Sequence, residues 1–159
     1  MNRINNILQN KKFEEYIRRN KEYEKNREFC HHHMQHFLDV ARIIYIRVLE
    51  NKMAIEKDMV YATALLHDIG RWLEYETGIP HEKAGVQLAE EILMECGYEK
   101  QEIECILKAI GDHRNSNNFK NSLSELLYSS DKISRSCFNC NAYNQCKWSN
   151  EKKNNNIKY

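Results

Sequence analysis

The stretch DMVYATALLHDIG, residues 58–70, decides the fold that we predict for this chain. Asp58 is suited to begin a helix, because its side chain can accept a hydrogen bond from a backbone amide of the first turn. Val60, Ala64 and His67 follow at spacings of four and three residues, which places them on one face of a helix. The stretch therefore predicts a helix whose buried apolar face ends in a histidine.

Helical spacing of apolar residues extends outward from this stretch in both directions. One proline and five glycines interrupt the 159 residues, and no segment shows the sustained alternation typical of a strand. We predict an all-α fold, a compact bundle of about six helices. Gly70 and Gly97 are suited to the left-handed conformation in which many helices end. The expected helices cover residues 3–27, 28–51, 58–70 and 82–96, then one that ends near residue 113, a polar loop over 115–121 and one that contains 123–131.

The length and charge of the chain limit the classes of protein to which it can belong. A chain of 159 residues is about the size of one domain. We predict a single domain over residues 1–148, with an N-terminal covering helix and a C-terminal cysteine segment, and a disordered Asn/Lys-rich tail over 149–159. The 24 basic and 23 acidic residues give no strong nucleic-acid signal. No apolar run approaches the ~18 residues of a membrane span, so we expect a cytoplasmic protein.

Polar side chains continue the apolar faces of three predicted helices. His67, His113 and Asp131 each lie one turn beyond apolar residues of their own helix. A single inward histidine is more often a packed core residue than a ligand. A buried, unpaired aspartate is costly, however, so two histidines and an aspartate on inward faces suggest a compensating cation. Imidazole and carboxylate together suit iron, manganese, zinc or magnesium.

Three longer stretches carry a family resemblance: HFLDVARI at 36–43, ATALLHDIGR at 62–71 and YSSDKISR at 128–135. They resemble the HD superfamily of metal-dependent phosphohydrolases, which is named for an adjacent His-Asp pair. A lone His-Asp dipeptide carries little information, whereas this ordered set is specific and spans most of the predicted helical core. The resemblance implies an HD-domain helical bundle whose metal ligands are His36, His67, Asp68 and Asp131.

Two further segments extend the resemblance: HEKAGVQLAEEIL at 81–93 and AIGDHR at 109–114. They are similar to segments through which symmetrical diadenosine-tetraphosphate hydrolases and cyclic-dinucleotide phosphodiesterases supply histidines for a second metal. The resemblance implies that His81 and His113 bind a second ion and that Asp68 bridges the two. Structural explanations stay open, in which His81 is an exposed helix-entry residue and His113 a helix-end residue favoured by the macrodipole.

Three cationic residues are placed to contact phosphate oxygens bound at the metals. Arg71 lies one turn beyond Asp68, while Lys132 and Arg135 lie close to Asp131 in the sequence. We assign substrate binding to Arg71, Lys132 and Arg135; a solvated surface position is the alternative for each. Catalytic roles are assigned to Asp68 and Arg71. Single-metal nucleotidases of the superfamily often carry a glutamate at the position of Arg71, which makes a simple monophosphate nucleotidase less attractive.

The segment SRSCFNCNAYNQCKW, residues 134–148, contains Cys137, Cys140 and Cys146 as C-x2-C-x5-C. Three thiolates at this spacing are one short of a closed tetrahedral zinc site. Cys30 is the predicted fourth ligand, because the helix that follows it must approach the helix that precedes the cluster. A structural zinc is favoured; an iron–sulfur cluster or unliganded packing cysteines stay open.

Other potential ligands are left unassigned. Cys96 and Cys105 fall in amphipathic stretches and are expected to be small buried residues. The three histidines of the run HHH at 31–33 cannot all converge on one site, because consecutive residues point in different directions on a helix; at most one or two could contribute.

The resemblance implies a metal-dependent phosphohydrolase that attacks a nucleotide or dinucleoside polyphosphate with a metal-activated water. The expected cofactor is a divalent metal, Fe, Mn or Mg, bound as two ions, and the expected partner is a small phosphorylated substrate. Two other classes stay open: an HD-type di-iron oxygenase and a non-catalytic sensor of nucleotide or redox state. The oligomeric state is not predicted.

Overall fold

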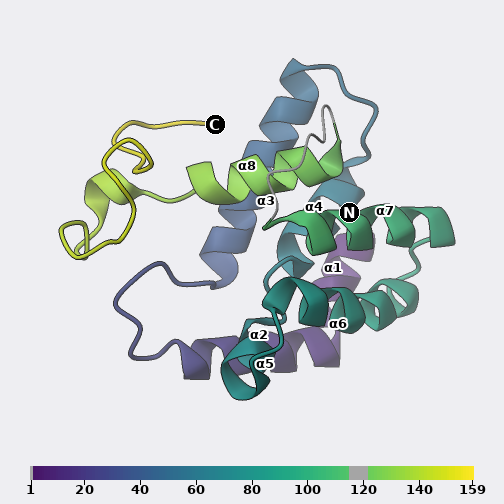
Figure 1. Cartoon of the computed structure of the whole chain (residues 1–159). Coiled ribbons are helices and arrows are strands. Elements are labelled where there is room, and N and C mark those ends of the chain that lie inside the picture. The colour runs from purple at the N-terminus through teal and green to yellow at the C-terminus, as the bar shows by residue number, and fades with distance from the viewer. Residues whose placement is uncertain (1, 115–121) are drawn as a thin grey trace.

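The computed structural model describes residues 2–114 and 122–159, and this part of the chain folds into helices without strands (Figure 1). The all-α prediction is confirmed, while the predicted loop at 115–121 lies outside the described residues. The helices are α1 (Asn2–Gln9), α2 (Lys11–Tyr23), α3 (Met34–Glu50), α4 (Lys57–Leu66), α5 (Arg71–Thr77), α6 (His81–Glu95), α7 (Lys100–Asp112), α8 (Leu123–Ile133) and a 3-10 turn, η1 (Cys137–Asn139).

Helix α4 lies at the centre of the bundle, where α1, α3, α6, α7 and α8 all pack against it. Its residues Val60, Ala64, Leu65 and Leu66 are completely buried. Fully burying one Val or Leu side chain contributes about 1.5–3 kcal/mol to folding. The core is therefore built around the helix that delivers the His-Asp pair, and this helix ends at that pair.

The first two predicted helices differ from the observed ones. Asn10 divides the first into α1 and α2, because its side chain accepts hydrogen bonds from the backbone amides of Lys12 and Phe13 and caps a new helix. The second helix begins at Met34 instead of residue 28, with His33 as its N-cap. Residues 24–33 form an irregular connection, which proves important for the site.

Gly70 has a different role from the one predicted. Its φ of −83° is not left-handed, and it precedes α5, a helix of seven residues that is too short to give a periodic signal. A Cβ at Gly70 would lie 2.6 Å from the backbone oxygen of His81, so glycine is needed here for the close approach of α6. Gly97 does adopt the predicted left-handed conformation, with φ +79°. Asp58 does not cap α4 but pairs with Arg3 at 2.7 Å.

The C-terminal segment packs back on the end of α8. The Asn154 side chain is buried and donates hydrogen bonds to the backbone oxygens of Lys132 (2.7 Å) and Arg135 (3.0 Å). Figure 1 shows this segment on the same side of the molecule as the connection between α2 and α3. Packing thus continues beyond the predicted domain boundary at residue 148; the single-domain organisation and the disorder of residues 149–159 stay predictions. In the described part of the chain, no helix is both long and apolar enough to cross a membrane.

Candidate metal centre

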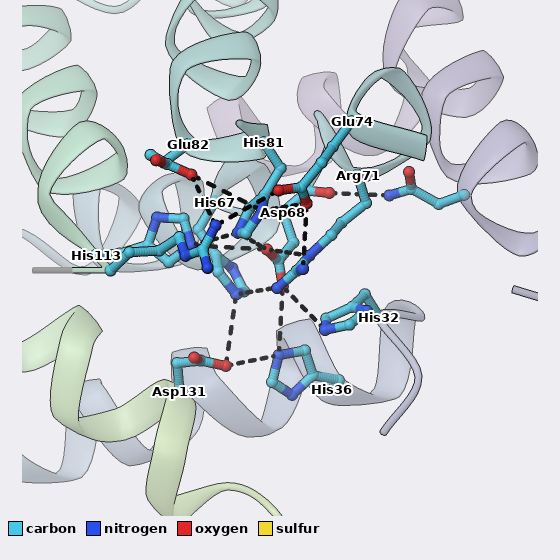
Figure 2. Close-up of polar contacts among 12 residues, drawn as sticks. His32, His36, His67, Asp68, Arg71, Glu74, His81, Glu82, His113 and Asp131 are labelled. Carbon is cyan, nitrogen blue, oxygen red and sulfur yellow. Dashed lines mark hydrogen bonds and ion pairs between the residues drawn. The ribbon is translucent and has the colours of Figure 1, made fainter. Parts of the chain in front are cut away.

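Six side chains from five helices or helix ends meet at one point in the bundle (Figure 2). They are the six residues predicted from the sequence as metal ligands, and all but Asp131 are almost completely buried. α3 supplies His36, the end of α4 supplies His67 and Asp68, the start of α6 supplies His81, the end of α7 supplies His113, and α8 supplies Asp131.

The first group consists of His36, His67, Asp68 and Asp131, whose ligand atoms all lie within 4.8 Å of one another. His36 Nε2 lies 3.1 Å from Asp131 Oδ1, and His67 Nε2 lies 3.1 Å from Asp68 Oδ2. Two ligand atoms that each lie about 2.0–2.2 Å from one ion are separated from each other by distances close to the 3.1 Å observed here. The group therefore has the spacing of a metal site.

The second group consists of Asp68, His81 and His113. Asp68 Oδ1 lies 3.2 Å from His81 Nε2 and 3.6 Å from His113 Nε2, while the two imidazole nitrogens are 3.1 Å apart. Asp68 thus directs Oδ1 toward this group and Oδ2 toward the first. One carboxylate with an oxygen in each group is placed to bridge two ions.

The hydrogen bonds of the imidazoles test whether these residues suit a metal. His67 Nδ1 donates to the Ala64 oxygen at 2.7 Å, and His113 Nδ1 donates to the Ile110 oxygen at 2.6 Å. These bonds assign a proton to Nδ1, so Nε2 of each ring is directed at the site and can bind a metal once it carries no proton. Within the described residues, the buried atoms His67 Nε2 and Asp68 Oδ2 have no hydrogen-bond partner. Such orphaned groups are costly unless a cation binds them, so the donor set fits divalent metal.

The charge states of the site also suit metal binding. Burial acts against ionisation of Asp68, but Arg71 and His67 outweigh it and hold the pKa of this carboxyl well below its usual range. Burial lowers the pKa of His36 to about 4 and that of His81 to about 3. Burial also opposes protonation of His67, yet the carboxylates beside it raise its pKa to about 10. The site thus offers ionised carboxylates and two neutral imidazoles, those of His36 and His81. The carboxylates around His67 also give the site an excess of negative charge, which attracts a cation.

Two of the three predicted cationic residues contact these groups, whereas Lys132 contacts Tyr128 and lines the pocket. Arg71 Nε donates to Asp68 Oδ1 at 3.0 Å, and an Arg135 NH2 group donates to Asp131 Oδ1 at 3.1 Å. Lys132 lies with its Nζ 3.2 Å from the centre of the Tyr128 ring. All three cations line the pocket that opens over the metal groups, which is where a substrate would reach them.

This pocket has a volume of about 580 Å³, and its lining is strongly basic. Asp131 is its one acidic residue among the described residues. Phe29, Tyr143 and Trp148 add aromatic surface. The basic residues that line it are Arg27, Arg71, Arg114, Lys132, Arg135, Lys147 and Lys153. A chain with almost balanced charge therefore concentrates positive charge around this one cavity.

Sequence reasoning missed His32, the middle residue of the HHH run. It is buried, and its Nε2 lies 3.8 Å from Asp68 Oδ2. Its Nδ1 contacts the Glu24 carboxylate, which also accepts a hydrogen bond from the His32 backbone amide at 2.7 Å. His31 and His33 are exposed and stack on each other. No periodic signal could reveal this arrangement, because residues 24–33 are not helical.

Glu74 is a second residue that the sequence did not indicate. Its Oε2 accepts a hydrogen bond from His81 Nδ1 at 2.7 Å. A carboxylate behind a histidine ligand fixes the ring and strengthens it as a ligand. Glu74 lies on α5, the helix that sequence periodicity could not predict.

The cysteines fall into two sets. Cys30, Cys137, Cys140 and Cys146 all line the pocket. Cys96 is buried as expected, whereas Cys105 is exposed because it faces outward on α7. The prediction that Cys105 is buried is therefore wrong.

Comparison with known proteins gives two matches. The family model described as HD domain matches residues 33–137. An uncharacterised protein of Clostridium beijerinckii is 44% identical over 161 residues, an alignment that covers 100% of both chains. No solved structure matches the chain.

Proposed function

The chain belongs to the HD domain family, and we propose that it is a dinuclear phosphohydrolase acting on a nucleotide or dinucleoside polyphosphate. The family is one of metal-dependent phosphohydrolases, and the buried His/Asp groups could bind metal. The observation that carries the dinuclear proposal is the position of Asp68, which directs one carboxylate oxygen into each group of ligands.

The residues fit two ions of iron, manganese or magnesium. His36, His67 and Asp131 would hold one ion, His81 and His113 the other, and Asp68 would contact both. When bound, such ions supply Lewis acidity that activates water and offsets phosphate charge. Arg71 orients Asp68 through their 3.0 Å hydrogen bond, and its remaining guanidinium donors can bind a phosphate oxygen. Glu74 holds the His81 ring in place.

The pocket supports a substrate with several phosphates. Lys147 and Lys153, both in the C-terminal segment, line the pocket. Within the described residues, neither lysine forms an ion pair with a carboxylate. Ammonium groups without a counter-charge favour an anionic ligand. Trp148 offers a face against which a nucleobase can stack, whereas the Lys153 ammonium lies over the Tyr143 ring, 4.1 Å from its centre. A substrate with one reacting phosphate at Asp68 and further phosphates near these lysines would use the whole cavity.

A hydrolysis panel tests the proposal. Protein loaded separately with Mn²⁺, Fe²⁺ or Mg²⁺ is assayed for phosphate release from a nucleoside monophosphate, a nucleoside triphosphate and a dinucleoside tetraphosphate. We expect kcat/KM to be at least about tenfold higher for the polyphosphates, equivalent to one additional charged contact. Asp39→Ala, which removes a surface carboxylate of α3 that is 39% exposed, serves as the matched control for Asp68→Ala.

Two results would contradict this assignment. Equal or faster hydrolysis of the monophosphate would overturn the substrate class. Oxygen consumption by the iron-loaded protein, without phosphate release from any substrate, would replace hydrolysis with the oxygenase chemistry that the sequence left open.

A further inference from the structure

The outer wall of the pocket comes from two segments that flank the region matched to the HD domain. Residues 33–137 match the family, yet Phe29 and Cys30 line the pocket from before this region, and Tyr143 and Cys146 line it from after. Cys30, Cys140 and Cys146 belong to these flanking segments, and Cys137 is the last residue of the matched region. The two cysteines inside the matched helices lie elsewhere. Cysteines are thus gathered where the two flanking segments face each other.

Apolar burial contributes little to the stability of the C-terminal segment. After η1 it forms no helix, and from residue 137 onward its buried residues are Cys137, Lys153 and Asn154. Phe138 is 53% exposed and Ile157 is 84% exposed. Ordering the backbone of one residue costs about 1–2 kcal/mol, and a segment with so little apolar burial offsets little of it. Small structures of this kind are usually stabilised by disulfides or a structural metal.

Two of the four cysteines belong to one short turn. Cys137 and Cys140 lie at the two ends of the η1 turn, where the Cys140 amide donates to the Cys137 oxygen at 3.2 Å. The turn ends at Asn139 with Cys140 as its C-cap, and both cysteines line the pocket. Burial raises the pKa of the Cys30 thiol, and the nearby Cys137 and Cys140 thiols raise it further. Cys30 lines the same pocket as Cys137 and Cys140.

Hydrogen bonds fix the two segments at this junction. Arg27 Nε donates to the Cys30 oxygen at 2.8 Å. An Arg135 NH1 group donates to the His31 oxygen at 3.2 Å, which links the end of α8 to the connection before α3. These two guanidinium groups also place positive charge beside the cysteines, and such charge favours thiolates.

We propose that Cys30, Cys137, Cys140 and Cys146 bind one zinc ion that joins the two flanking segments and fixes the outer wall of the pocket. Four thiolates close a tetrahedral site with Zn–S distances of about 2.3 Å and leave no position for a substrate, so this ion is structural. Binding releases the four thiol protons to solvent and leaves a net charge of −2 on the zinc and its ligands, which the Arg27 and Arg135 guanidinium groups beside the cysteines offset. No three of these sulfurs lie within 4.8 Å of one another in the structure, so zinc binding would require the thiols to move closer together.

Metal analysis in an Asp68→Ala background separates this site from the His/Asp groups. We expect the Asp68→Ala protein, purified from zinc-supplemented cells, to retain one equivalent of zinc. Adding Cys146→Ser should remove that zinc, while adding Cys105→Ser, at the exposed cysteine of α7, should not. Loss or survival of the proposed hydrolase activity does not affect this measurement, so the two proposals fail independently.

Thiol alkylation of the wild-type protein provides a test that needs no variant. With zinc bound, we expect iodoacetamide to label Cys105 and to spare the four wall cysteines. A chelator should expose all four and make the chain sensitive to trypsin at Lys147. Labelling of the wall cysteines at the Cys105 rate in the presence of zinc would overturn the proposal. Iron with acid-labile sulfide in place of zinc would overturn the assignment of the ion.

Discussion

Replacing Gly70 with alanine should damage the second metal group through the packing of α6. The new Cβ would lie 2.6 Å from the His81 oxygen and 2.7 Å from the Gly85 nitrogen. Both are backbone atoms, so no side chain can rotate away. Helix α6 would have to move by about 0.8 Å to restore an ordinary contact distance, and His81, its first residue, would move with it.

The structure sets the size of the effect. Overpacking of a tight contact costs about 1–3 kcal/mol, and each kcal/mol lowers Tm by about 2–4 °C in a protein of this size. A displacement of ~1 Å at a catalytic group lowers activity by up to about 100-fold. His81 Nε2 now lies 3.2 Å from Asp68 Oδ1, so the same movement should weaken the second ion and leave the first in place.

Gly97→Ala is the matched control. Gly97 follows the opposite end of α6, and a Cβ there meets no atom within 4 Å, but its φ of +79° would strain an alanine. That strain costs about 1–2 kcal/mol, so the two variants should lose similar stability. We expect elemental analysis to find one ion at the His/Asp site of Gly70→Ala and two in Gly97→Ala. Equal metal content in the two variants would refute the role of Gly70 in placing His81.

Three substitutions around the site give further expected outcomes. Asp68→Ala should remove both ions and hydrolysis while leaving the helical circular dichroism spectrum largely unchanged, since it deletes the shared ligand; wild-type turnover would contradict the bridge. Glu74→Gln should weaken metal binding by about 10–100-fold, measured by competition with a chelator, because His81 loses a charged partner; unchanged affinity would contradict this role. His32→Ala should lower thermal stability, because it leaves the buried Glu24 carboxylate without its imidazole partner. The exposed His31→Ala should not, and equal melting temperatures would contradict that interpretation.

Helical periodicity accounts for the part of the site that the sequence could predict directly. His67, His113 and Asp131 each continue an apolar stripe, and such a stripe is buried in any helical bundle. The direction of these side chains therefore follows from the sequence without knowledge of the tertiary arrangement. His81 carries no such signal, and the family resemblance alone indicated it.

The remaining parts depend on contacts between segments that are distant in the sequence. His32 reaches the site from an irregular connection whose path is set by the buried Glu24 and its bond to the Tyr75 hydroxyl at 2.8 Å. Gly70 suggested a helix stop, because glycine at a close approach and glycine at a left-handed position look alike in sequence. The burial of Asn154 was equally hidden, since its surroundings have the composition of an exposed tail.

The floor and the wall of the pocket are built for different tasks. The floor consists of helices within the HD region, and its carboxylates and imidazoles could bind metal; in the proposed function they hold two ions at the reacting phosphate. The wall consists of the flanking segments. Its lysines, Lys147 and Lys153, line the pocket from the C-terminal segment and are not part of the metal groups. A monophosphate held at the floor would leave the Lys147 and Lys153 ammonium groups without an anion, whereas a polyphosphate could engage both ends. Family membership therefore accounts for the metal-binding residues of the floor, while the proposed choice of a polyphosphate substrate rests on the residues of the wall.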